Sequence, residues 1–352
     1  MEPLNVHDWE RLAEERLDAG VFGYIAGGAG DEHTLRDNVE AFRRVRLRPR
    51  MLVDVSAVST HATVLGHDVS MPVLVAPTAY QRLMHPDGEA ATARGAAAAG
   101  TVFCHSTLSS LRPAELAHAA PASSRWFQLY WSSDRGFTAA LVAEAEENGY
   151  TALVLTVDLP VAGRRERDLR EAFELPPDLP LPCLSPNLER PADPGAGLGP
   201  VVDESLTWRD LEWLTARTRL PLAIKGVLTR EDAVLACEHG AAAVVVSNHG
   251  GRQLDGVPAS LDALPEVVEA VGDRCEVLAD GGVRRGTDVL AALALGARAV
   301  LVGRPVLYGL GAAGEDGVRA VLELLRAEVA SGLALLGCPS PADVTPAHVA
   351  RV

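Results

Sequence analysis

The sequence predicts an α/β fold, a closed (β/α)8 TIM barrel, and two observations carry that prediction. First, short apolar runs such as Val73–Ala76, Leu153–Leu155 and Val244–Val246 alternate with alanine-rich helical stretches. Such runs fit strands that are buried on both faces, as in a parallel sheet covered by helices. Second, polar residues follow the ends of these runs, and in a barrel those positions meet at one mouth. The alternation alone also fits an open, doubly wound sheet, but the polar residues favour the barrel.

A single domain, 1–352, is expected, with the barrel at approximately 71–311. The expected strands are Pro72–Pro77, Thr101–Ser106, Trp126–Tyr130, Ala152–Asp158, Pro221–Lys225, Ala243–Asn248, Glu276–Asp280 and Ala299–Gly303. The helical stretches between them are Gly88–Ala99, Arg135–Asn148, Arg230–His239, Leu261–Val271 and Thr287–Leu295. An N-terminal extension carries helical stretches near Val6–Leu17 and Thr34–Arg43, and a long helix is expected around Val318–Leu335.

The connection after the fourth strand is unusually long, at approximately 175–206, and it is rich in proline and glycine. It shows no hydrophobic period, so neither a helix nor a strand is expected in it. Long loops of this kind at a barrel mouth are often lids. We therefore expect a mobile loop beside the active site.

Composition excludes several classes of protein. The formal net charge of -15 argues against nucleic-acid binding, because phosphates require a basic face. No apolar run reaches the roughly 20 residues that span a bilayer, and the N-terminus lacks a secretory signal pattern. A cytoplasmic protein without membrane contact is expected. The five cysteines have neither metal-binding nor redox spacing, and no metal site is predicted.

The strongest local signal for chemistry is the segment Ser247–Asp255, which follows a buried strand. His249 and Arg252 lie three residues apart there, so both can meet one substrate. Two glycines follow the histidine and let the backbone pass close to a ligand. A lone loop histidine is more often structural, but this combination favours a catalytic one. Asp158 also ends an apolar strand, where a carboxylate needs a partner such as a histidine proton.

Two glycine-containing turns follow the seventh and eighth strands, Asp280–Arg284 and Gly303–Arg304. Each leads into a helix, and backbone N–H groups at helix N-termini bind phosphate. Arg165 is suited to bidentate recognition of a carboxylate, although an arginine on a loop is often merely solvated. Lys225 is either a surface lysine or a cation that faces an anionic cofactor ring or forms a Schiff base.

With these residues the chain resembles the family of FMN-dependent 2-hydroxy-acid oxidases and dehydrogenases, which includes glycolate oxidase, lactate oxidase and mandelate dehydrogenase. The resemblance covers nearly the whole chain and includes Tyr24–Gly28, Pro77–Ala79, Thr107–Ser110, Phe127–Tyr130, Thr156–Asp158, Ile224–Gly226, Ser247–Asp255 and Asp280–Arg284. It implies FMN as the cofactor and oxidation of an (S)-2-hydroxy acid to the 2-oxo acid as the reaction.

The resemblance also implies roles for individual residues. His249 would be the base and Asp158 would orient it. Arg165, Arg252 and Tyr24 would bind the substrate carboxylate, Tyr130 the substrate hydroxyl, and Lys225 would stabilise charge on the reduced flavin. The implied flavin contacts are Pro77, Thr78, Ala79, Ser109, Gln128, Thr156, Lys225 and Ser247, and the implied phosphate contacts are Asp280, Gly281, Gly282, Val283, Arg284, Gly303 and Arg304.

Two features bear on the substrate. Plant-type glycolate oxidases carry tryptophan two residues after the flavin serine, where this chain has Leu111, and a smaller residue leaves room for an aryl group. The segment around Tyr80 resembles 4-hydroxymandelate oxidases more than glycolate oxidases. Mandelate or 4-hydroxymandelate is therefore the favoured substrate, with a small aliphatic acid such as glycolate or lactate as the alternative.

The resemblance further implies a homo-oligomer, a tetramer as in relatives. The loop after the fourth strand lacks a contiguous apolar segment and no haem domain precedes the barrel, so O2 is the expected acceptor and H2O2 the product. A different-class alternative is an FMN barrel isomerase of the type 2 isopentenyl diphosphate kind, which has no need of a histidine and paired arginines. A non-catalytic binding barrel is disfavoured because every expected site residue is present.

Overall fold

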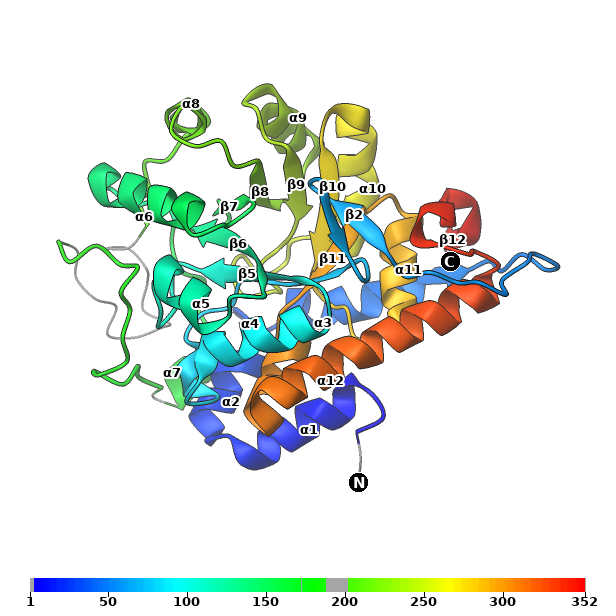
Figure 1. The fold of residues 1–352 in the computed structure, drawn as a ribbon, viewed down its shortest axis with the longest axis horizontal. Helices are drawn as coiled ribbons and strands as arrows, with labels where there is room; N and C mark the ends of the chain where they lie inside the picture. Colours follow the sequence, from blue (N-terminus) through cyan, green and yellow to red (C-terminus); the bar gives the residue numbers. More distant parts are fainter. Residues whose placement is uncertain (1–2, 172, 188–201, 352) are drawn as a thin grey trace.

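The computed structural model describes residues 3–171, 173–187 and 202–351. Eight parallel strands close into a barrel, and the last strand pairs with the first (Figure 1). In chain order they are β4 (Val73–Val75), β5 (Val102–Ser106), β6 (Ser124–Leu129), β7 (Leu153–Thr156), β8 (Leu222–Val227), β9 (Ala243–Val246), β10 (Glu276–Asp280) and β11 (Ala299–Val302). Each expected strand overlaps one of these, so the predicted (β/α)8 barrel is confirmed.

Helices follow the strands and cover the outside of the barrel. They are α4 (Gly88–Ala98), α5 (Pro113–Ala119), α6 (Arg135–Glu147), α7 (Glu166–Arg170), α8 (Asp210–Thr215), α9 (Arg230–Glu238), α10 (Ser260–Val271), α11 (Gly286–Ala294) and α12 (Arg304–Leu336). Short 3-10 helices lie at Ala41–Arg44, Gln81–Leu83, Gly272–Arg274, Pro341–Asp343 and Pro346–His348. Helix α12 bends at Ala313 and Gly314, and its second part contains the long helix predicted around Val318–Leu335.

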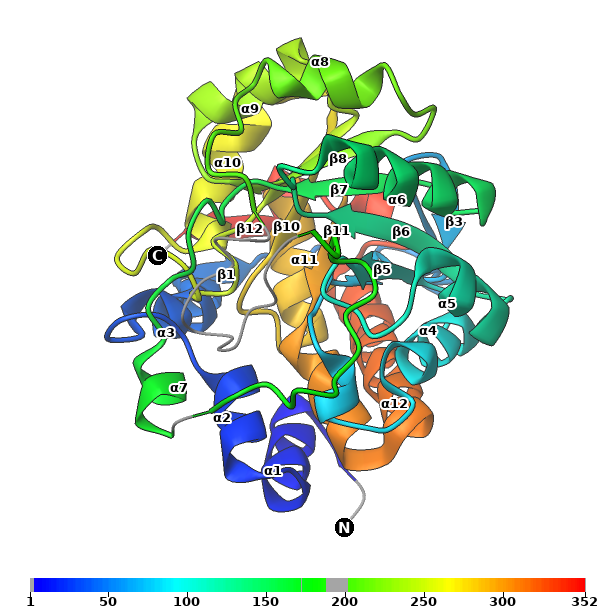
Figure 2. The ribbon, with the colours of Figure 1, turned by 90° about the vertical axis from the view of Figure 1, so that its left-hand side faces the viewer.

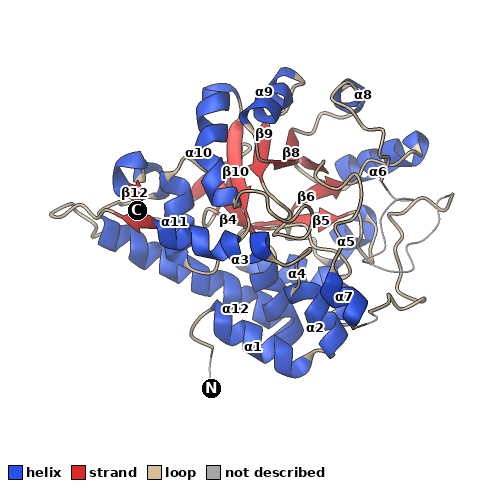
Figure 3. Ribbon diagram, turned by 180° about the vertical axis from the view of Figure 1, so that it is seen from behind, coloured by secondary structure: helices blue, strands red, loops and turns tan. Residues whose placement is uncertain are grey.

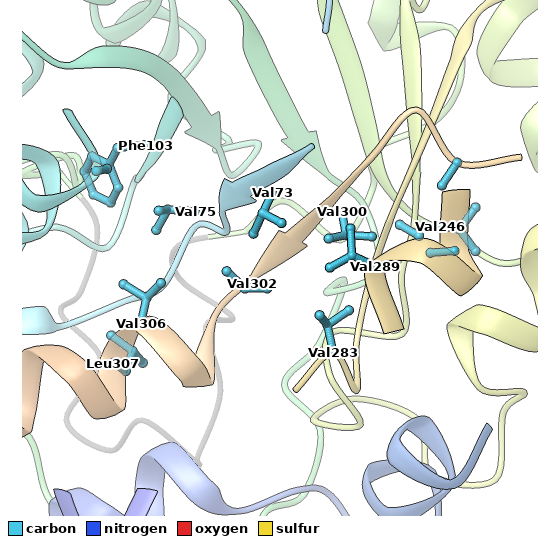
Figure 4. Packing of buried hydrophobic residues seen from close by; sticks show 14 of the residues in the cluster. Val73, Val75, Phe103, Val246, Val283, Val289, Val300, Val302, Val306 and Leu307 are labelled. Carbon is cyan, nitrogen blue, oxygen red and sulfur yellow. The ribbon is translucent and has the colours of Figure 1, made fainter. Parts of the chain in front are cut away.

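Alternate residues along each barrel strand belong to two different cores, which explains the unbroken apolar runs. Val73 and Val75 of β4 face the helices together with Val300 and Val302 of β11 (Figure 4). Leu74, between them, belongs to the cluster inside the barrel. The hairpin of β2 (Ala62–Val64) and β3 (His67–Val69) adds valines to that inner cluster. It thereby closes the N-terminal end of the barrel and leaves the other end for the site.

The N-terminal extension wraps around the barrel before the first barrel strand. It comprises α1 (Val6–Arg16), α2 (Ala19–Ala26), α3 (His33–Glu40) and β1 (Val45–Leu47), and β1 pairs with β12 (Val349–Arg351) near the C-terminus. Helix α1 packs along α12, and α2 lies beside α7 (Figures 2 and 3). The sequence predicts the first and third of these helices. It does not predict α2, in which glycines at 20 and 23 reduce helix propensity.

The long connection expected at approximately 175–206 falls partly outside the described residues, since 188–201 are not described. Its described parts, 175–187 and 202–206, contain neither helix nor strand, as expected. Among residues 3–171, 173–187 and 202–351, no helix combines the length and apolar character that a membrane crossing requires.

Candidate active site

A cavity opens at the carboxyl ends of the barrel strands, where barrel enzymes keep their active sites. It encloses about 1060 Å³ of empty space, including its open mouth. Most of the predicted site residues line it: Tyr24, Pro77, Thr78, Ala79, Tyr80, Tyr130, Arg165, Lys225, His249, Arg252, Asp280, Gly281, Gly282, Val283, Arg284, Gly303 and Arg304. Residues from the N-terminal extension and from many barrel loops therefore meet in one place.

The remaining predicted residues lie behind this wall. Gln128, Thr156, Ser109 and Ser247 are buried within or just after the strands. The Ser247 hydroxyl oxygen accepts hydrogen bonds from the Lys225 ammonium at 3.0 Å and from the His249 backbone N–H at 3.1 Å. Ser247 therefore holds the Lys225 ammonium and the backbone of His249, and both of these residues line the cavity.

Leu111, which the aryl-substrate prediction relies on, is not among the residues that line the cavity. Its backbone N–H donates to the Ser109 hydroxyl oxygen at 3.1 Å. Its carbonyl oxygen accepts from the Cys183 thiol at 3.5 Å. The backbone of Leu111 therefore contacts the loop after β7.

His249 and Asp158 form the expected pair, with 2.8 Å between Nδ1 and the carboxylate oxygen Oδ1. The backbone of His249 is left-handed, with φ of 58°, and Gly250 and Gly251 continue the turn with φ of 64° and 75°. Such a turn is costly for a residue with a side chain, so its presence points to a required position for the ring. With Nδ1 directed at the carboxylate, Nε2 is the nitrogen left for a substrate.

The pair has electrostatics that suit a base. Burial lowers the pKa of His249 below its ordinary value, although the Asp158 carboxylate opposes this shift. Burial alone would raise the pKa of Asp158, but the charges of His249 and Lys225 hold it below its ordinary value. At neutral pH the imidazole is therefore neutral and able to accept a proton, while the carboxylate is ionised and stabilises the protonated ring.

Two arginines lie around the Tyr24 ring, with guanidinium carbons 4.8 Å (Arg252) and 5.8 Å (Arg165) from its centroid. Arg252 Nη1 donates to the carbonyl oxygens of Tyr24 at 2.7 Å and Gly27 at 3.0 Å. Burial and the neighbouring Arg165 lower the pKa of Arg252. Two desolvated cations at one wall make a favourable place for a carboxylate.

Lys225 contacts Asp280, which also lines the cavity, with 3.2 Å between Nζ and Oδ2. Both side chains are nearly inaccessible to solvent. Burial alone would lower the pKa of Lys225, but the carboxylates of Asp280 and Asp158 raise it above its ordinary value. The lysine is therefore a fixed cation, and the Schiff-base alternative, which needs a neutral amine, is disfavoured.

The predicted phosphate turns lie against the N-terminal extension. Gly281 and Gly282 are left-handed, and a Cβ on Gly282 would lie 2.0 Å from the carbonyl oxygen of Asn38. Arg304 starts α12 and donates from three nitrogens to the carbonyl oxygens of Ile25, Gly250 and Gly27, at 2.8 to 3.0 Å. Burial lowers its pKa to about 9, so it stays charged at neutral pH.

The residues present fit a flavin mononucleotide. Among the described residues, Gln128 Nε2, Thr156 Oγ1 and Asp280 Oδ1 are buried polar atoms without a hydrogen-bond partner. A flavin ring offers carbonyl acceptors and an N–H donor to such groups, and the Lys225 cation suits the charge of a reduced ring. The glycine turns and the N-terminus of α12 would hold the phosphate.

Sequence reasoning did not find the contacts by which α3 holds the histidine loop. Asn38 and Asn248 exchange two side-chain hydrogen bonds, each 2.8 Å long. Asp255 accepts from the backbone N–H groups of His33 and Thr34 at the start of α3. These partners are more than 200 residues apart in the sequence, so no local sequence pattern predicts their contacts.

Comparisons with known proteins agree with this geometry. The family described as FMN-dependent dehydrogenase matches residues 13–351. The chain is 51% identical to an L-lactate oxidase from Nostoc sp. over 97% of this chain and 96% of the relative. It is 48% identical to glycolate oxidase 3 of Arabidopsis thaliana over 99% of this chain and 96% of the relative.

Solved structures of mandelate oxidase are also similar. One has a TM-score of 0.90 at 44% identity and another 0.88 at 45%, each covering 97% of both chains. The cavity and the long matches lead to one conclusion. This chain belongs to the FMN-dependent dehydrogenase family, its relatives are FMN-dependent 2-hydroxy-acid oxidases, and its cofactor is FMN.

Proposed function

We propose that the enzyme oxidises an (S)-2-hydroxy acid to the corresponding 2-oxo acid. The observation that carries the proposal is the hydrogen-bonded pair of His249 and Asp158, with His249, Arg165 and Arg252 lining one cavity. When bound, FMN would supply the two-electron acceptor, with O2 as the final oxidant and H2O2 as its product. The isomerase alternative has no use for this combination of base and carboxylate site.

Each site residue has a role that follows from its position. Arg165 and Arg252 bind the substrate carboxylate, which places the 2-hydroxyl group near the imidazole. The oxidation removes two protons and two electrons from the substrate: His249 Nε2 accepts one proton, bound FMN would take the electrons with the other, and Asp158 stabilises the imidazolium that forms. Tyr130 binds the same hydroxyl oxygen. Burial raises the pKa of Tyr130, so its phenol stays protonated and can donate.

Two candidates differ in the substrate side chain. The small aliphatic acid has the stronger support, because the relative named L-lactate oxidase is 51% identical, above the 44–45% identity of the mandelate oxidase structures. The aryl candidate, mandelate or 4-hydroxymandelate, is supported by the mandelate oxidase structures at 44–45% identity.

The test is anaerobic reduction of the purified yellow enzyme by a panel of acids. L-lactate, glycolate, both mandelate enantiomers and 4-hydroxymandelate are mixed with the enzyme, and flavin absorbance is followed. We expect bleaching by (S)-acids, with L-lactate faster than (S)-mandelate. The opposite order would select the aryl candidate, and bleaching by none of the acids would overturn the proposal. Air is then admitted, and failure to form one H2O2 per turnover would refute O2 as acceptor.

A further inference from the structure

One side chain in the histidine segment is not accounted for by the reaction. Gln253 belongs to the segment 247–255 after β9, four residues after His249. Its side chain reaches the neighbouring segment 158–165, which follows β7. Its Nε2 donates to the carbonyl oxygens of Asp158 and Val161, both at 2.9 Å. Its Oε1 accepts from the backbone N–H of Gly163 at 3.1 Å. Both amide hydrogens and the amide oxygen are thus used on one neighbouring loop.

The two loops are in direct contact at this point. A Cβ on Gly163 would lie 2.3 Å from the carbonyl oxygen of Arg252 and 2.7 Å from the Cα of Gln253. No side chain therefore fits between them, and the spacing of the loops is set by backbone contact and by the Gln253 amide. Three hydrogen bonds from one planar group restrict sliding as well as separation.

Each loop carries half of the proposed machinery. The segment 158–165 begins at Asp158 and ends at Arg165, whereas the other segment carries His249 and Arg252. The Asp158–His249 hydrogen bond and the placement of both guanidinium groups around Tyr24 depend on the same loop spacing. The Gln253 amide donates a hydrogen bond directly to the backbone carbonyl oxygen of Asp158, so it lies at the contact between the two loops.

We propose that Gln253 is a positioning residue that holds the base pair and the two arginines in register. This inference rests on the proposed function of His249 and Asp158. The competing role is purely structural, in which the amide only stabilises two surface loops. The two roles predict different results, because a positioning role affects the reacting atoms in protein that is fully folded and loaded with flavin.

The decisive variant is Gln253→Met, which keeps the length of the side chain and removes all three hydrogen bonds. A second variant, Gln253→Glu, keeps an acceptor for the Gly163 N–H but places a carboxylate against two carbonyl oxygens. The matched control is Leu254→Ala, the next residue along, whose side chain is 73% exposed. Flavin content and Tm are measured for every variant, and rates are expressed per bound flavin.

We expect Gln253→Met to slow anaerobic flavin reduction by about 10–100-fold per bound flavin, as misplacement of reacting groups by up to about 1 Å does. Gln253→Glu should be slowed at least as much, and Leu254→Ala should match the parent. The histidine pKa gives a second readout. The Asp158 carboxylate raises the pKa of His249, so a loosened pair should titrate at lower pH than the parent.

That pKa is read from the ¹³C-labelled histidine ring signals, with the His249 signal identified by its absence in His249→Ala. Unchanged reduction rate and an unchanged His249 titration in Gln253→Met would overturn the inference. A lower Tm with an unchanged rate per flavin would assign Gln253 a structural role only. Failure of the proposed function is separate, because it would show as retained substrate reduction by His249→Ala itself.

Discussion

Gly282→Ala tests whether α3 forms part of the cofactor site. The new methyl group would lie 2.0 Å from the carbonyl oxygen of Asn38 and 2.4 Å from its carbonyl carbon, so α3 or the turn must shift. Alanine in the left-handed backbone of Gly282 costs about 1–2 kcal/mol. Overpacking against a fixed backbone adds about 1–3 kcal/mol. Destabilisation of about 2–5 kcal/mol is expected.

Gly240→Ala is the matched control. Gly240 has φ of 84°, close to the 81° of Gly282, and a Cβ there would meet no atom within 4 Å. Gly240→Ala therefore has the free-energy cost of a left-handed alanine backbone without the steric clash. We expect the Tm of Gly282→Ala to be lower than that of Gly240→Ala by at least about 2 °C.

The cofactor provides the second measurement. Because Gly282 lines the cavity and Gly240 does not, FMN titration of the flavin-free protein should show at least about tenfold weaker binding for Gly282→Ala alone. Equal Tm values and equal FMN affinities for the two variants would refute the reasoning that α3 is pressed against this turn.

Three further predictions concern the reaction. The rate at low substrate concentration should fall as the pH decreases and His249 becomes protonated, with a midpoint below pH 6.5, because burial lowers the pKa of His249 from its ordinary value of 6.5; a midpoint above 6.5 would contradict the assignment. Asp158→Asn should slow flavin reduction by about 100-fold or more with FMN affinity preserved, as single-turnover mixing would reveal. Arg252→Lys should raise the apparent Kd for substrate by about tenfold or more, since lysine cannot reproduce the contacts to Tyr24 and Gly27; an unchanged Kd would remove Arg252 from the carboxylate site.

Much of the fold is predictable because its causes are local. Unbroken apolar runs mark the strands, and polar residues at their ends mark the mouth, so His249 and Lys225 could be placed at the cavity without coordinates, and Asp158 beside His249. What escaped prediction depends on contacts between distant residues. The Asn38–Asn248 amide pair and the three bonds of Gln253 leave no periodic pattern in the sequence.

The surroundings of Leu111 show the same limit in the site itself. The aryl-substrate prediction took Leu111 as a substrate residue from the resemblance, in which plant-type glycolate oxidases carry tryptophan at that position. The structure adds a contact that the sequence does not predict, in which the Leu111 carbonyl oxygen accepts from the Cys183 thiol on the loop after β7. Side-chain direction in an irregular loop depends on backbone dihedrals and tertiary contacts, which neither spacing nor composition specifies.

The long reach of the N-terminal extension has a consequence for the order of folding. Carbonyl oxygens of residues 24–27 accept hydrogen bonds from Arg252 and Arg304, across sequence separations of 225 to 279 residues. Because the N-terminal extension is synthesised before the last barrel units, its native hydrogen-bond partners do not yet exist when it leaves the ribosome. Contacts of such separation form late, because loop-closure entropy opposes them. During refolding, helical and strand structure should return before the carboxylate site does, so the ability to turn over substrate is the last property that the chain acquires.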